Sequence, residues 1–168
     1  MYKIIRNYLS ADECDDYIAM TRVLDPNPTL EVGLNTKKKP LHHVNRTYWT
    51  LRSMTKHLRP LKALAEQYWD LPEGKLKFSH APKNFAHIMC YDSPGQGLEW
   101  HAEPTISTVS VSINLSNPWE YEGADFELRK VPELELHRGD AIFYSSTMVH
   151  RVADLVSGRK LSFVMWLK

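Results

Sequence analysis

Apolar and polar positions along this chain follow two different patterns, which divide it into two parts. In the first part, Met1 to Asn7 predicts a short strand, and Ser10-Ala-Asp-Glu13 is a capping box that opens a helix through about Val23. From Tyr48 to Trp69 apolar residues recur at helical spacing, with Pro60 as a break or a first-turn residue. The helices are therefore expected in the N-terminal part of the chain.

The segment from Asp25 to Asn45 is too polar and too interrupted to form a regular element. Loops longer than roughly 12–15 residues in a compact domain are usually functional lids or disordered segments. We therefore expect a surface loop here that closes over a site. The residues that interrupt the segment are Pro26, Pro28, Gly33, Pro40 and the run Lys37-Lys38-Lys39.

From Gly74 onward the pattern changes to short apolar or alternating runs separated by turn signals, such as Tyr121-Glu-Gly123 and Val156-Ser-Gly158. Short strands at regular spacing are typical of a sandwich or jelly roll, whose two sheets can hold a site between them. We expect one mainly β domain with N-terminal helices packed on one sheet. Residues 1–72 would form helical support and lid, and residues 73–168 the jelly-roll core. The predicted strands are Lys75–His80, Phe85–Tyr91, Ile106–Leu115, Ala124–Leu128, Glu133–Leu136, Ala141–Tyr144, Val149–Val152 and Lys160–Leu167.

The composition excludes several classes of protein. The chain has 168 residues, of which 43% are hydrophobic and 24% charged, unlike disordered, collagen-like or disulfide-rich chains. A net charge of +1 gives no overall field for holding a phosphate backbone. Because neither a signal peptide nor a membrane span is evident, we expect a cytoplasmic protein. Cys14 and Cys90 form no CxxC pair, so we expect reduced, packed thiols.

Histidine and acidic residues in the second half suggest a metal site. In Trp100-His101-Ala102-Glu103, positions 101 and 103 of an extended segment point to the same side, so an imidazole and a carboxylate converge. His150 lies at the start of a later predicted strand, and strands distant in sequence face each other in a jelly roll. Two histidines and one carboxylate form the facial triad that suits non-haem Fe(II) and leaves coordination positions open.

Lys160 and Ser162 suggest an anion site beside the metal. If Lys160–Leu167 is a strand, the two side chains share one face. A lysine that faces the interior is costly unless it pairs with an anion. A dicarboxylate that chelates the metal at one end and pairs with Lys160 at the other would offset that cost, and this describes 2-oxoglutarate.

Taken together, these residues resemble a known family. The stretch from Phe85 to Trp166 is similar to the Fe(II)/2-oxoglutarate-dependent dioxygenases, in particular the prolyl 4-hydroxylase-like branch and the bacterial PKHD-type hydroxylases. The resemblance implies a double-stranded β-helix, the cupin-like jelly roll. In chain order, it rests on Tyr91, His101/Glu103, Asn114-Leu-Ser116, Tyr121 to Leu128, Arg138 to Phe143, Ser145 to Val152, Gly158 to Ser162 and Trp166.

The resemblance implies that His101, Glu103 and His150 are the iron ligands. The family usually has Asp at the position of Glu103. The extra methylene moves the carboxylate by more than the roughly 0.5 Å tolerance of a preorganised site, unless the strand retreats to compensate. A carboxylate displaced in this way would weaken iron binding.

The resemblance also implies a set of co-substrate contacts. Lys160 would pair with the distal carboxylate of 2-oxoglutarate, with Ser162 and Tyr91 as helpers. Arg159 is the competing anchor, because it is also basic and only one position earlier. Asn114 is expected near the co-substrate, to which its amide can hydrogen-bond.

The implied activity is hydroxylation of an unactivated C–H bond, with release of succinate and CO2. The substrate would be a peptidyl residue, with proline favoured, or a small amino-acid-like molecule. Fe(II), 2-oxoglutarate and O2 are the implied cofactors, and ascorbate is allowed as an accessory reductant. The alternative is a catalytically impaired jelly-roll module that binds a metal or a carboxylate ligand. Neither a nucleic acid nor a membrane is an expected partner, and both a monomer and a homodimer stay open.

Overall fold

A six-stranded antiparallel sheet forms the frame of the molecule. The computed structural model describes residues 1–24, 26, 47–51, 55–79 and 85–168. The strands of this sheet are β1 (Tyr2–Ile5), β2 (Thr47–Leu51), β3 (Ala86–Tyr91), β5 (Val109–Asn114), β8 (Ala141–Ser145) and β11 (Lys160–Leu167). Their order is β1-β8-β5-β11-β3-β2, so the two N-terminal strands lie at the edges and β11 lies near the centre.

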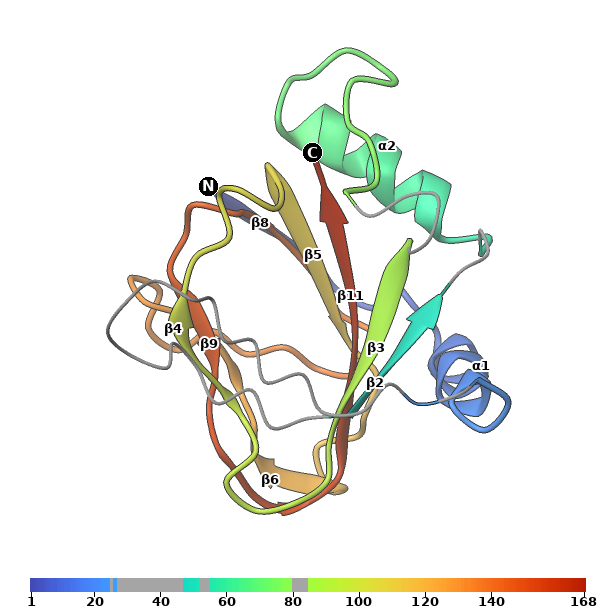
Figure 1. Ribbon diagram of the computed structural model, residues 1–168, viewed down its shortest axis with the longest axis vertical. Helices are drawn as coiled ribbons and strands as arrows, with labels where there is room; N and C mark the ends of the chain where they lie inside the picture. Colours follow the sequence, from blue (N-terminus) through green and yellow to red (C-terminus); the bar gives the residue numbers. More distant parts are fainter. Residues whose placement is uncertain (25, 27–46, 52–54, 80–84) are drawn as a thin grey trace.

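Two smaller sheets close the other side of the molecule. They consist of β4 (Leu98–His101), β9 (His150–Val152) and β7 (Phe126–Leu128) in that order, and of β6 (Tyr121–Gly123) paired with β10 (Leu155–Gly158). Figure 1 shows β4 and β9 across the interior from β5 and β11. This arrangement of a large sheet facing two smaller ones confirms the predicted jelly roll with N-terminal helices.

Strand β11 has two faces of different chemistry, which separates the hydrophobic core from the candidate site. Because side chains alternate along a strand, odd and even positions point to opposite sides of the sheet. The odd positions Leu161, Phe163, Met165 and Leu167 are buried in the main hydrophobic core. The even positions Lys160, Ser162, Val164 and Trp166 line an internal cavity.

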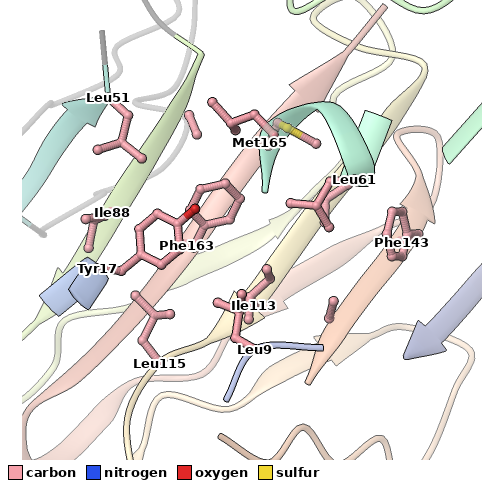
Figure 2. Packing of buried hydrophobic residues seen from close by; sticks show 14 of the residues in the cluster. Leu9, Tyr17, Leu51, Leu61, Ile88, Ile113, Leu115, Phe143, Phe163 and Met165 are labelled. Carbon is pink, nitrogen blue, oxygen red and sulfur yellow. The ribbon is translucent and has the colours of Figure 1, made fainter. Parts of the chain in front are cut away.

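Two helices cover the core face of the large sheet. They are α1 (Ala11–Met20) and α2 (Leu58–Tyr68). Tyr17 of α1 lies with its ring centroid 5.2 Å from that of Phe163, and Leu61 of α2 is fully buried in the same cluster. Figure 2 shows both side chains gathered over Phe163 and Ile113. The apolar faces of the helices therefore pack on one face of the large sheet, and the opposite face of that sheet lines the cavity.

The predicted capping box begins α1. The Glu13 N–H donates to Ser10 Oγ at 3.2 Å, and the Ser10 N–H donates to Glu13 Oε2 at 3.0 Å. These bonds satisfy backbone donors that have no partner within the helix. The helix ends at Met20, close to the predicted end at Val23.

The second predicted helix is correct only in its later half. Residues 47–51 form strand β2 rather than helix, and α2 begins at Leu58. Tyr48, Trp49 and Thr50 favour an extended chain, because aromatic and β-branched side chains pack well on a sheet. Pro60 lies in the first turn of α2, where its missing N–H costs no helical hydrogen bond.

Two predicted strands are wrong. Within Lys75–His80, Phe78 forms only an isolated bridge with Leu167, and Ser79 lies in a turn. Glu133–Leu136 is irregular, because Pro132 lacks an N–H and Glu133 adopts a left-handed backbone with φ 58°.

The reverse error occurs at β6 and β10, whose sequences predict turns. Both segments are short and contain glycine, so each alone indicates a turn, yet the two pair with each other. Gly158 has φ 81°, and a Cβ at this position would collide with the carbonyl oxygen of Glu120. Glycine therefore allows β10 to turn directly into β11, where Lys160 is the first residue.

Most of the predicted lid, Asp25 to Asn45, including the lysine run at 37–39, lies outside the described residues. Among the residues that the structure describes, no helix is long and apolar enough to cross a membrane.

Candidate functional site

His101, Glu103 and His150 come together in the interior, as predicted. His101 on β4 lies directly opposite His150 on β9, with ring centroids 4.1 Å apart, and Glu103 follows two residues later. One potential ligand atom from each residue lies within 4.8 Å of the others. Antiparallel pairing of two strands thus supplies two imidazoles, and the chain that leaves β4 supplies the carboxylate.

Hydrogen bonds to backbone carbonyls fix the tautomer of both histidines. His101 Nδ1 lies 2.8 Å from the Glu99 carbonyl oxygen, and His150 Nδ1 lies 2.9 Å from that of Met148. Because a carbonyl only accepts, Nδ1 must carry the proton, and in the neutral ring the lone pair is on Nε2. Metal-binding histidines are commonly oriented in this way by a second hydrogen bond.

Burial keeps His150 in the neutral form that a metal needs. The side chain is almost completely inaccessible to solvent. Burial and the nearby His101 lower the pKa of His150 to about 4. At neutral pH, its Nε2 lone pair is therefore available without loss of a proton.

Glu103 reaches the cluster despite its longer side chain. Its N–H donates to the Ser146 carbonyl oxygen at 2.8 Å, and Trp166 Nε1 donates to its Oε2 at 2.7 Å. Its other oxygen, Oε1, lies 3.8 Å from His101 Nε2. Burial alone would raise the pKa of Glu103, but the nearby His101 and the hydrogen bond from Trp166 lower it below its usual value. The site thus holds an ionised carboxylate beside the neutral imidazole of His150.

We expect Trp166→Phe to weaken divalent metal binding by roughly tenfold, the lower end of the usual effect of losing a group that orients a ligand. The phenyl ring keeps most of the packing but cannot donate to Glu103. Calorimetric titration of the protein with Co(II) measures the effect, and Trp119→Phe at an 81% exposed position is the matched control. Equal affinities for the two variants would show that the indole does not position Glu103.

A cavity opens beside these three residues, between the large sheet and the β4-β9-β7 sheet. The empty space in and around its mouth, open solvent included, amounts to about 500 Å³. Besides His101, Glu103 and His150, its lining residues are Met89, Tyr91, Leu98, Ser112, Phe126, Tyr144, Val152, Lys160, Ser162, Val164 and Trp166. The metal-type cluster therefore borders a mainly apolar chamber with a few polar groups, which is the usual form of a small-molecule site.

Lys160 brings a buried positive charge to this cavity. Its side chain is only 5% exposed, its Nζ donates to the carbonyl oxygen of Ala124, and it lies 5.1 Å from the centre of the Tyr121 ring. Among the described residues, no carboxylate lies within ion-pair distance of Nζ. Burial lowers the pKa of Lys160 to about 8, against an opposing effect of Asp125. The ammonium is thus mostly charged at neutral pH and poorly compensated, so an anion in the cavity would stabilise it.

The other predicted co-substrate residues divide into two groups. Ser162 and Tyr91 line the cavity next to Lys160, since Ser162 shares its face of β11 and Tyr91 is its cross-strand partner on β3. Arg159 points elsewhere, with its Nε 3.3 Å from the buried Sγ of Cys90. Asn114 does not line the cavity, and its amide donates to Tyr121 Oη and to the Leu136 carbonyl oxygen.

Two further cavity residues carry polar groups to which the sequence reasoning assigns no role. Trp166 holds Glu103, and Tyr144 lies with its Oη 3.4 Å from His150 Nε2. The period of two along β11 could have indicated Trp166, because it shares a face with Lys160. No local signal distinguishes Tyr144 within the apolar run of β8.

Comparisons with known proteins place these observations in context. No protein-family model matches the chain. The chain is 31% identical over 88 residues to a PKHD-type hydroxylase of Psychrobacter sp. (strain PRwf-1), a match that covers 44% of this chain and 34% of the relative. It is 32% identical over 74 residues to a PKHD-type hydroxylase of Hyphomonas neptunium, covering 39% and 33%. The matches thus span about a third of these curated relatives and confirm the resemblance to the PKHD-type branch.

Solved structures agree with the fold over the whole chain. A viral collagen prolyl hydroxylase from Paramecium Bursaria Chlorella virus-1, in a 2OG complex, has a TM-score of 0.69 at 15% identity, covering 99% of this chain and 94% of that one. A prolyl-4-hydroxylase from Pseudomonas putida has a TM-score of 0.67 at 16% identity, covering 99% and 91%. The alpha ketoglutarate dependent epimerase SnoN from nogalamycin biosynthesis has a TM-score of 0.69 at 18% identity, covering 99% and 77%. At these identities the likeness establishes the jelly-roll fold.

Proposed function

We propose that this chain is an Fe(II)- and 2-oxoglutarate-dependent dioxygenase. The observation that carries the proposal is the convergence of two features on one cavity: a His-Glu-His cluster and a buried lysine without a carboxylate partner among the described residues. Either feature alone would fit several kinds of binding site. Together, they match the two ends of a metal-chelating dicarboxylate.

The residues present fit a divalent iron ion. Two neutral imidazoles and one carboxylate are the donor set of the 2-His-1-carboxylate class, and both Nε2 lone pairs are set by hydrogen bonds on the far side of the ring. His101, Glu103 and His150 would hold the ion. An Fe(II) ion in such a site supplies the activation of O2 coupled to decarboxylation of 2-oxoglutarate to succinate and CO2.

The chain itself positions the co-substrate and controls its surroundings. Lys160 would bind the distal carboxylate, and the hydroxyls of Ser162 and Tyr91 border the same end of the cavity. Leu98, Val152 and other apolar residues line the remaining wall and limit access of water. Exclusion of water strengthens the charge pairing and limits side reactions.

Hydroxylation of a peptidyl residue, with proline favoured, is the proposed reaction on the prime substrate. It is supported by the similarity to PKHD-type hydroxylases and by the fold shared with prolyl hydroxylases, among them one described in complex with a hypoxia inducible factor peptide. A small amino-acid-like substrate is the second candidate. A protein of the same fold is described with hygromycin B bound, which supports a small-molecule substrate in general and not an amino-acid-like one in particular.

Anaerobic titration with Fe(II) and then 2-oxoglutarate tests the proposal. Chelation of the co-substrate at the ion should produce a visible metal-to-ligand charge-transfer band that saturates at one equivalent of each. Metal or carboxylate binding with no such band would favour the alternative of a binding module. A folded protein that binds neither component would contradict both.

The affinity for 2-oxoglutarate should fall as pH rises above about 8. The free protein holds Lys160 protonated below its pKa of about 8, and only the ammonium pairs with a carboxylate. The charge of Asp125 opposes the effect of burial by raising the pKa of Lys160, and the ring of Tyr121 packs against the Lys160 ammonium. Titrations with 2-oxoglutarate between pH 6.5 and 9.5, with Co(II) saturating at each pH, measure the profile. An affinity that stays constant across this range would contradict the assigned role of Lys160.

A further inference from the structure

Tyr144 places a phenol hydroxyl at the metal end of the cavity. It lies on β8 of the large sheet, is only 2% exposed and lines the cavity. Its Oη lies 3.4 Å from His150 Nε2, and its ring centroid lies 4.8 Å from that of His150 and 5.2 Å from that of Phe126. The phenol thus reaches across the sandwich from one sheet to the candidate ligand on the other.

The contact between Tyr144 and His150 uses the electron pair that a metal needs. Because His150 Nδ1 is committed to the Met148 carbonyl oxygen, Nε2 has a lone pair and no proton. Oη must therefore be the donor. An imidazole nitrogen has only one lone pair, so the phenol and an ion at Nε2 compete for it.

We infer that Tyr144 is a second anchor for the co-substrate: when an ion binds His150, the hydroxyl turns from Nε2 to a carboxylate oxygen of the 2-oxo acid bound beside it. This inference rests on the proposed function and extends it to the metal end of the co-substrate. Lys160 and Tyr144 then bind opposite ends of the same molecule. The ligand class for the Tyr144 end is any 2-oxo acid, with or without a distal carboxylate.

Two variants and two ligands separate the roles. Tyr144→Phe should lower the affinity of the Co(II)-loaded protein for both 2-oxoglutarate and pyruvate by about tenfold or more, since tenfold is the lower end of the loss expected for one hydrogen bond to a charged group. Its affinity for Co(II) itself should stay unchanged or rise slightly, because a competitor for the lone pair is gone. Lys160→Met should lower the affinity for 2-oxoglutarate but not for pyruvate, because pyruvate has no distal carboxylate.

Tyr68→Phe is the matched control, since Tyr68 packs against Phe143 on the helix-covered face of the sheet. Calorimetric titrations with Co(II), and then with each acid, give all the affinities. Retained Co(II) binding in Tyr144→Phe shows that the site is folded. Loss of Co(II) affinity in parallel with acid affinity would mean that Tyr144 only supports His150, and unchanged acid affinity would also overturn the inference. If the wild-type protein bound Co(II) but neither acid, that result would contradict the proposed function itself, and the inference about Tyr144 would fall with it.

Discussion

Replacing Lys160 by Met is expected to raise the dissociation constant for 2-oxoglutarate at least 100-fold and to leave the free protein as stable as wild type or more so. The lysine has a neutral carbonyl and an aromatic face as contacts, and it lacks a carboxylate at ion-pair distance among the described residues. It is also the only lysine or arginine among the described residues that line the cavity, so its removal costs binding of the distal carboxylate. Removing a poorly compensated buried ammonium, in contrast, removes the free-energy cost of burying that charge, so the folded state should not be destabilised.

The effect on stability has a defined sign and pH range. Burial lowers the pKa of Lys160 from 10.5 to about 8, so between these two values the unfolded chain binds more protons than the folded one. The contribution of Lys160 to the stability of the wild-type protein should therefore rise with pH through this range, by up to roughly 3 kcal/mol at about 1.4 kcal/mol per pKa unit, in addition to the changes from buried Tyr and Cys groups that both proteins share. Lys160→Met should lack this rise. Chemical unfolding at pH 7.5 and 10 measures both.

Arg159→Met is the matched control for this experiment. The two basic residues are neighbours in sequence, but Arg159 contacts Cys90 and does not line the cavity. Its replacement should leave 2-oxoglutarate binding within a factor of about two. Loss of binding in Arg159→Met with retention in Lys160→Met would show that Arg159, and not Lys160, is the anchor.

Replacing His150 by Ala is expected to abolish specific metal binding. The variant lacks one of three ligands, so its loss of affinity should exceed the roughly 10–100-fold that follows removal of groups behind a ligand. A ligand present at 100 times its dissociation constant stabilises a fold by about 2.7 kcal/mol. Mn(II) should therefore raise the melting temperature of the wild-type protein and not that of His150→Ala.

The exposed His137 offers a control for the histidine substitution. His137→Ala removes an imidazole at the surface, away from the metal cluster. It should keep the full stabilisation by Mn(II). If His150→Ala kept it as well, the ion would bind elsewhere and the assigned ligand set would be wrong.

The centre of the site is predictable from the sequence because its residues follow local rules. His101 and Glu103 have the spacing of a shared face, and Lys160, Ser162, Val164 and Trp166 follow the period of two along β11. The helix-cap signal is also reliable, because it depends on a few neighbouring residues, as in the box formed by Ser10 and Glu13.

The features that the sequence does not predict depend on contacts between distant segments. β6 and β10 are strands because they pair with each other, and Tyr48 is in a strand because β3 lies beside it. Asn114 is expected near the co-substrate, but its amide is committed to Tyr121 and Leu136. Tyr144 has no signal in the sequence because only the fold brings its hydroxyl to His150.

Glu103 illustrates how tertiary structure resolves a doubt that the sequence raises. Its extra methylene, compared with the Asp usual in the family it resembles, suggests a displaced carboxylate. The backbone of Glu103 is hydrogen-bonded to Ser146, and the Trp166 indole holds one carboxylate oxygen, so the other faces His101. The longer side chain is therefore compatible with the predicted donor set.

The central claim is that the chain couples metal-dependent decarboxylation of 2-oxoglutarate to the activation of O2. Its most direct test is succinate formation in air by the purified protein supplied with Fe(II), 2-oxoglutarate and ascorbate, with His150→Ala and Lys160→Met measured in parallel. We expect succinate in amounts exceeding the protein for wild type and none above background for either variant. A wild-type protein that binds Fe(II) and 2-oxoglutarate but forms no succinate, with or without proline-containing peptides, would contradict the claim.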